Sequence, residues 1–183
     1  MRNLESDMIN RIVKQVCKEI LLPLGVFQKG TSRTYIDDNG YFLTILEFQP
    51  SAYAKGIYLN VALHFLWNGR EALSLDFPFG QEVRIKGFVE YQNDEQFTDA
   101  VTEYAKEAAA QVLFYRKLRD LSAAKSYAKK WMRKYQGNHH SNELDMFNRL
   151  EDREIKQRIK QTRAFWHSKP SMRRMKKDDV YDV

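Results

Sequence analysis

The chain has 183 residues, of which 43% are hydrophobic and 13% aromatic, a composition typical of folded globular proteins and not of disordered chains. No apolar run approaches the roughly 20 residues of a membrane-spanning helix, and the single cysteine, Cys17, excludes an intrachain disulfide. The N-terminal segment is charged throughout and lacks the apolar stretch of a signal peptide, so we expect a cytoplasmic protein.

The first predicted element is a helix over residues 4–20. Apolar residues recur in it every three to four positions, the spacing that places them on one face of a helix packed against a core. Pro23 and Gly25 follow, and they end the helix because proline cannot continue it and glycine tolerates the exit conformation.

Four strands are predicted next, over residues 33–37, 41–49, 57–67 and 82–91. Asn39-Gly40 lies between the first two and is expected to supply the positive φ values of a hairpin turn. Asp37 and Asp38, just before it, are interpreted as turn formers. The strand at 41–49 is apolar on both faces, which predicts a central strand that is covered on both sides.

Helical patterns fill the rest of the chain. Asn93 with Gln96 resembles a capping box, and Ser122 is expected to cap a second helix. A long charged helix is expected to begin at Ser141 or Asn142 and to end near Pro170.

This order of elements predicts an α+β fold with an N-terminal helix, a mainly antiparallel β-sheet of about four strands, and C-terminal helices. We divide the chain into a core domain at 1–120, basic helices at 121–168 that pack on the core or extend from it, and a flexible tail at 169–183.

Residues 21–65 carry a resemblance to a known family. The segments "LLPLGVFQKG", "SRTY", "NGYFLTILEFQ" and "IYLNVAL" resemble the bacterial domain of unknown function 4304 family, in which a helix ending in Pro-Leu-Gly is followed by two long strands. Val26 stands between Gly25 and Phe27, where the family pattern places the aromatic residue directly after glycine. The resemblance implies an α+β fold and a bacterial or related source, and it implies no catalytic residue.

Polar residues that interrupt the apolar strands are the candidates for a ligand pocket: Glu47, Gln49, Asn60 and His64. If even-numbered residues of the two strands align, Asn60 and His64 share a face with Leu46 and Phe48. A buried Asn or His must be hydrogen-bonded and can mark a pocket. The alternatives are a satisfied structural network and a solvated rim of the sheet.

The sequence offers no catalytic or metal-binding motif. It contains no phosphate-binding loop, dinucleotide fingerprint, nucleophile elbow or HExxH pattern. His139 and His140, with His167, lack the cysteines or spaced carboxylates that would complete a zinc site. We therefore predict no catalytic residue, no metal and no cofactor. A non-enzymatic protein is favoured, although missing motifs do not exclude an enzyme.

The net charge of +6 is concentrated in the last third of the chain. Residues 125–177 hold 16 lysines and arginines against 5 acidic residues, whereas residues 1–124 hold 14 against 16. Lysines one helical turn apart can span phosphates, and neighbouring aromatic residues (Tyr127, Trp131 and Tyr135) can stack on bases. The alternative is a solvated helix face with Trp131 and Trp166 buried. The candidate contact residues are Lys125, Lys129, Lys130, Arg133, Lys134, Lys156, Lys160 and Arg163.

Three functions follow from these patterns. The first is a binding protein that meets an acidic protein partner through the basic C-terminal helices, for example as a toxin-immunity partner. The second is nucleic-acid binding through residues 125–177. The third is a small-ligand or enzymatic pocket on the sheet. No membrane partner is expected. A homodimer through the final helix is kept as an alternative, because an isolated amphipathic helix needs another surface to cover its apolar stripe.

Overall fold

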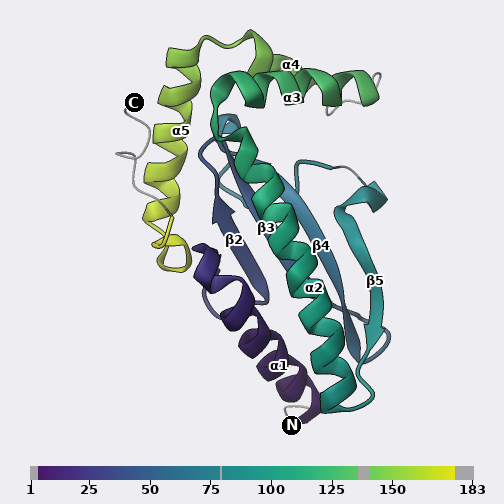
Figure 1. The fold of residues 1–183 in the computed structure, drawn as a ribbon. Coiled ribbons are helices and arrows are strands. Elements are labelled where there is room, and N and C mark those ends of the chain that lie inside the picture. The colour runs from purple at the N-terminus through teal and green to yellow at the C-terminus, as the bar shows by residue number, and fades with distance from the viewer. Residues whose placement is uncertain (1–3, 79, 136–140, 176–183) are drawn as a thin grey trace.

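The computed structural model describes residues 4–78, 80–135 and 141–175 of the chain. Within these ranges an N-terminal helix is followed by a five-stranded antiparallel sheet and then by C-terminal helices (Figure 1). This order confirms the predicted α+β fold class. None of the helices in these ranges is long and apolar enough to cross a membrane.

The sheet is a meander, in which every strand pairs with the next strand along the chain. All neighbouring strands are antiparallel, and their spatial order is β1 (Phe27–Gln28), β2 (Thr34–Asp38), β3 (Phe42–Pro50), β4 (Gly56–Phe65) and β5 (Arg84–Glu90). The last four match the predicted strands within a few residues. The strand β1 is not predicted from the sequence, because a strand of two residues shows no periodicity.

The turn between β2 and β3 lies at Asn39-Gly40, as predicted, but only Gly40 adopts a positive φ, of 111°. Asn39 stabilises the turn through its side chain instead, whose oxygen accepts from the backbone N–H of Phe42 at 3.0 Å. The Asp38 carboxylate accepts from the N–H of Gly40 at 3.1 Å. The expected pair of positive φ values is therefore wrong, since side-chain hydrogen bonds shape this turn.

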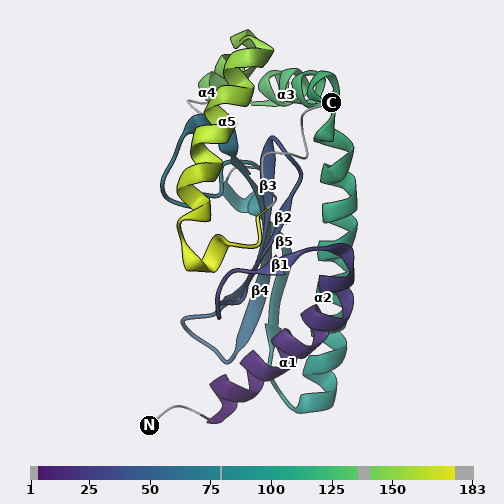
Figure 2. The ribbon, with the colours of Figure 1, turned by 90° about the vertical axis from the view of Figure 1, so that its left-hand side faces the viewer.

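Helices cover both faces of the sheet (Figure 2). On one face lie α1 (Leu4–Ile20) and α2 (Asp94–Tyr115), and on the other lies α5 (Asp152–His167). The apolar stripe of α1 is buried as predicted, and burial raises the pKa of the Cys17 thiol to about 12, which makes it an unreactive packing residue. Asn93 caps α2 as predicted, since its side chain accepts from the N–H of Gln96 at 2.9 Å.

The C-terminal helices differ in two places from the prediction. The cap of α3 (Leu121–Lys134) is Asp120 and not Ser122, because the Asp120 carboxylate accepts from the N–H of Ala123 at 2.7 Å. The long final helix is two helices, α4 (Ser141–Arg149) and α5, with an extended residue at Glu151 between them.

The break separates two apolar stripes that pack on different surfaces. The helix α4 lies beside α3 across the end of the sheet, whereas α5 runs along the sheet (Figure 1). Leu144 and Phe147 of α4 are buried, and so are Ile155 and Ile159 of α5. A single straight helix cannot bury both sets, so the chain turns between them.

The first part of the predicted tail packs against the rest of the chain. Residues 170–172 form a 3-10 turn, and Met172 and Met175 are buried in the same hydrophobic core as the helices. Ser171 lies against Gly30, with 3.4 Å between its Cβ and the position that a Cβ on Gly30 would take. The remainder of the predicted tail, at 176–183, lies outside the described residues.

Candidate functional site

The start of α5 is tied to α3 by a lysine. Lys125 donates to the Asp152 carboxylate at 2.8 Å and to the Leu150 carbonyl at 3.0 Å. Leu150 directly precedes the extended residue that opens α5, so this lysine holds the two helices together at a corner of the molecule.

Four of the predicted contact cations extend away from this corner along the two helices. Lys129 and Arg133 follow on α3 at one-turn intervals, and Lys156 and Lys160 do so on α5, so each row occupies one helix face and reaches about 12 Å from the corner. All four side chains are exposed. Among the residues that the structure describes, none of them makes an ion pair or hydrogen bond. We call these four residues the basic corner.

Three other predicted cations form ion pairs within the chain. The first is Lys125, described above. The second is Lys134, which pairs with Glu82 at 2.8 Å, and the third is Arg163. The Arg163 side chain is completely buried, pairs with the Asp38 carboxylate through both terminal nitrogens and donates to the Gly40 carbonyl at 3.1 Å. Arg163 is therefore not a surface contact, and its assignment to the binding set is corrected.

The two tryptophans of the basic segment are packing residues, each only 5% exposed. The ring of Trp131 lies 3.6 Å from that of Phe77, centroid to centroid and nearly parallel, and 4.1 Å from that of Tyr127. Trp166 packs edge-on against His64 at 6.1 Å. Neither indole offers an open ring face on which a base could stack.

The apolar stripe of α5 is likewise covered within the chain. Ile155, Ile159 and Trp166 are buried, and α5 packs against the 3-10 turn at Leu66–Asn68. The described part of α5 therefore has no uncovered apolar stripe, which was the reason for keeping a homodimer open.

Beneath α3 lies a cavity of about 360 Å³, which we call the aromatic cavity. The residues of α3 and its C-cap that line it are spaced i, i+3, i+4, i+7 and i+8, as expected for one helix face: Tyr127, Lys130, Trp131, Lys134 and Tyr135. Tyr115 at the end of α2 and Phe77 complete much of the wall. The predicted interleaving of aromatic and basic residues thus lines a cavity.

Three of the four predicted pocket residues meet on the sheet. The Asn60 side chain donates to Glu47 at 3.0 Å and to Gln49 at 2.8 Å, and Arg84 of β5 donates to Gln49 at 3.1 Å. These groups meet one another's need for hydrogen-bond partners, as expected for a structural network and not for a ligand pocket. Glu47, Asn60 and His64 do not line the aromatic cavity.

The condition that even-numbered residues of the two strands align is not met, and the observed pairing differs from it by one residue. Asn60 lies opposite Glu47, and His64 lies opposite Leu43. The turn after Pro50 pairs Pro50 with Ile57, so even-numbered residues of one strand oppose odd-numbered residues of the other. A change of one residue moves every side chain to the opposite face.

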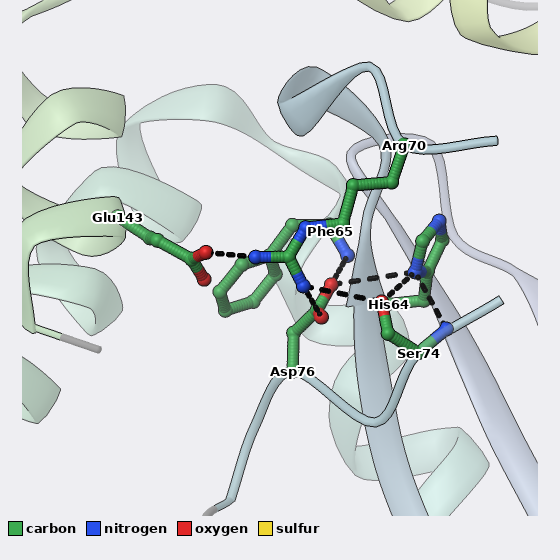
Figure 3. A network of polar contacts seen from close by, with 6 residues as sticks. All are labelled: His64, Phe65, Arg70, Ser74, Asp76 and Glu143. Atoms are coloured by element: carbon green, nitrogen blue, oxygen red, sulfur yellow. Dashed lines mark hydrogen bonds and ion pairs between the residues drawn. The ribbon is translucent and has the colours of Figure 1, made fainter. Parts of the chain in front are cut away.

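His64 belongs to a separate buried network (Figure 3). Its Nδ1 atom lies 3.0 Å from the Ser74 hydroxyl and 3.3 Å from the Asp76 carboxylate. A serine hydrolase needs the serine and the carboxylate on opposite ring nitrogens, whereas here both contact Nδ1. The Nε2 atom is buried with no hydrogen-bond partner in the described structure. These three residues are therefore not arranged as a catalytic triad.

Asp76 is the centre of this network (Figure 3). It accepts from the Phe65 N–H at 2.7 Å and pairs with Arg70 at 2.8 Å, and Arg70 also pairs with Glu143 of α4. Burial alone would raise the pKa of Asp76, but its interaction with the His64 ring and the hydrogen bonds from the Phe65 N–H and the Ser74 side chain hold that pKa below its ordinary value. The network joins the segment after β4 to α4, a structural role.

Two adjacent carboxylates in β2 anchor the helices on either side of the sheet. Asp37 and Asp38 are 2% and 3% exposed, and successive residues of a strand point to opposite faces. Arg116, just after α2, donates to both oxygens of Asp37 with Nε at 3.1 Å, and Arg163 of α5 holds Asp38 from the other face. Their interpretation as turn formers overlooks this role.

Within the described ranges, no group of three or more histidine, cysteine, aspartate or glutamate residues is placed to hold a metal ion. His139 and His140 lie outside those ranges.

Comparisons with known proteins give no relative: no protein-family model, curated protein or solved structure matches the chain. The resemblance to the domain of unknown function 4304 family therefore stays a prediction.

Proposed function

We propose that the chain is a non-catalytic cytoplasmic protein that binds an acidic protein partner through the basic corner. The observation that carries this proposal is that Lys129, Arg133, Lys156 and Lys160 are exposed and make no ion pair with any described residue. An immunity-type role toward a toxin is one form that the proposal takes. It assigns no catalytic residue.

The electrostatic contribution of such a surface is mainly to association. Exposed cations that lack partners raise the local concentration of an acidic protein and accelerate its encounter with the surface, by about 10-fold or more at low salt. Cations that already pair within the chain, such as Lys134 with Glu82, contribute less because their charge is neutralised.

A protein partner is favoured over a nucleic acid by the position of the aromatic rings. Binding of single-stranded nucleic acid combines a basic groove with exposed rings on which bases stack. Here the rings beside the lysines face inward, and Trp131 lies between Phe77 and Tyr127. The basic corner retains charge for a partner but not the stacking surface.

Charge reversal tests the proposal. The variants Lys129→Glu with Arg133→Glu, and Lys156→Glu with Lys160→Glu, each change the charge by the same amount as the control Lys14→Glu with Lys18→Glu. The control residues are exposed on α1. Affinity purification from the source cell should recover an acidic protein with the wild type and the control only. With purified components, the association rate constant should fall about 10-fold or more in the corner variants.

Equal recovery by all variants would contradict the proposal. Retention of RNA or DNA by the wild type, lost steeply between low and moderate salt, would instead identify a nucleic acid as the partner.

A further inference from the structure

The aromatic cavity has the size and lining of a small-molecule site. Its volume of about 360 Å³ lies at the lower end of the range of about 300–1,000 Å³ that is usual for ligand pockets, so it suits a ligand of one ring with substituents. Phe77, Tyr127 and Trp131 line it, and aromatic side chains attract another aromatic ring in edge-to-face as well as in offset-stacked contacts.

Tyr115 supplies a hydroxyl group at this cavity. Tyr115 is 6% exposed and lines the cavity, and its hydroxyl makes no hydrogen bond with any described residue. Burial is the main cause that raises the pKa of Tyr115, and the nearby Tyr127 and Tyr135 raise it further. At neutral pH the side chain therefore remains a phenol that can donate to a ligand.

The cavity also carries one uncompensated positive charge. Lys130 and Lys134 both line it, but Lys134 pairs with Glu82, which also accepts from the Tyr135 hydroxyl. Lys130 makes no ion pair or hydrogen bond within the described part of the chain. The cavity therefore favours a ligand with a single negative charge, because a second one would have no free cation opposite it.

We propose that the aromatic cavity binds a small aromatic carboxylate that bears a second hydrogen-bond acceptor on its ring. The ring packs against Tyr127 and the edge of Trp131, the carboxylate pairs with Lys130, and the second acceptor accepts from the Tyr115 hydroxyl. This site is independent of the basic corner, whose cations lie outside the cavity lining.

Three probes and three variants separate these contacts. The probe 4-hydroxybenzoate carries both polar groups, 4-hydroxybenzamide lacks the charge, and benzoate lacks the second acceptor. Lys130→Met removes the cation, Tyr115→Phe removes only the hydroxyl, and Lys129→Met is the matched control, since Lys129 is the neighbouring exposed lysine outside the cavity. Calorimetry measures each dissociation constant, and circular dichroism confirms that each variant is folded.

For the wild type, 4-hydroxybenzoate should bind more tightly than either comparison probe. Lys130→Met should weaken it about 10-fold and leave 4-hydroxybenzamide unchanged. Tyr115→Phe should remove the preference over benzoate, and Lys129→Met should change nothing. No binding of any probe at millimolar concentration, or equal effects of Lys130→Met and Lys129→Met, would overturn the proposal. Lys129 belongs to the basic corner, so Lys129→Met should weaken binding of the acidic partner. The same variant should leave binding of 4-hydroxybenzoate unchanged, and this difference distinguishes the two proposals.

Discussion

Replacing Arg163 with methionine should destabilise the protein far more than the loss of a surface ion pair. The side chains of Arg163 and Asp38 are 0% and 2% exposed, so the change leaves a buried carboxylate without its counter-charge and the Gly40 carbonyl without its donor. Breaking a buried pair in this way costs about 3–5 kcal/mol. That is a large part of the roughly 5–15 kcal/mol by which domains are stable.

The same loss can be expressed as a melting temperature. For chains of this length, 1 kcal/mol corresponds to about 2–4 °C, so Arg163→Met should melt roughly 6–20 °C below the wild type. Urea unfolding, followed by tryptophan fluorescence, gives the free energy directly. The midpoint should fall, and the slope should stay constant if unfolding remains two-state.

A matched control lies on the same helix. Arg158 pairs with Glu154 at 2.8 Å, with both side chains at least 39% exposed, and Arg158→Met should cost only about 0.5 kcal/mol. In the double variant with Asp38→Asn and Arg163→Met the buried site carries no charge, so part of the loss should be recovered. Arg163→Met could instead lower the unfolding free energy by less than about 1 kcal/mol, as little as Arg158→Met does. That result would refute the reasoning that the Arg163–Asp38 pair holds α5 to the sheet.

Two further changes test other parts of the fold. The folded-state pKa of Asp76 is lowered, so its carboxylate adds stability above its unfolded-state pKa of about 3.9 and loses that contribution as the pH falls through the folded-state value. Asp76→Asn should therefore lower the unfolding free energy at pH 7 and flatten its decline in acid, and identical urea profiles from pH 3 to 7 would contradict this. Gly56→Ala should cost about 1–3 kcal/mol or more, because the new Cβ would lie 2.0 Å from the Val89 carbonyl oxygen. Gly87→Ala on β5 meets no atom within 4 Å and serves as the control, so equal melting temperatures of the two variants would contradict that result.

Local patterns predicted the sheet well. The alternation in β4 and the two apolar faces of β3 have periods that a single segment displays, and Asn39-Gly40 marks the hairpin between β2 and β3. The relative register of β3 and β4 could not be predicted from the periodicity of either strand. It depends on the number of residues in the turn after Pro50, and the pattern of either strand alone is compatible with both alignments.

The burial of Arg163 had a signal in the sequence. Arg163 is four residues after Ile159 and three before Trp166, so it lies on the apolar stripe of α5 and not on its outer face. An arginine on such a stripe must be paired. The identity of its partner was not predictable, because Asp38 is 125 residues away in the chain and only the packing of α5 on the sheet brings them together.

The final helices are not a removable appendage, because Asp38 in the second strand depends on a guanidinium in the last helix. A chain cut after residue 120 would keep the carboxylate and lose its counter-ion, and it would uncover Trp67, which stacks on Phe147 of α4. During synthesis on the ribosome, β2 emerges long before Arg163 and completes its surroundings only when α5 has been made. Deleting the basic segment would therefore report on folding, and only substitutions of its exposed side chains can report on recognition.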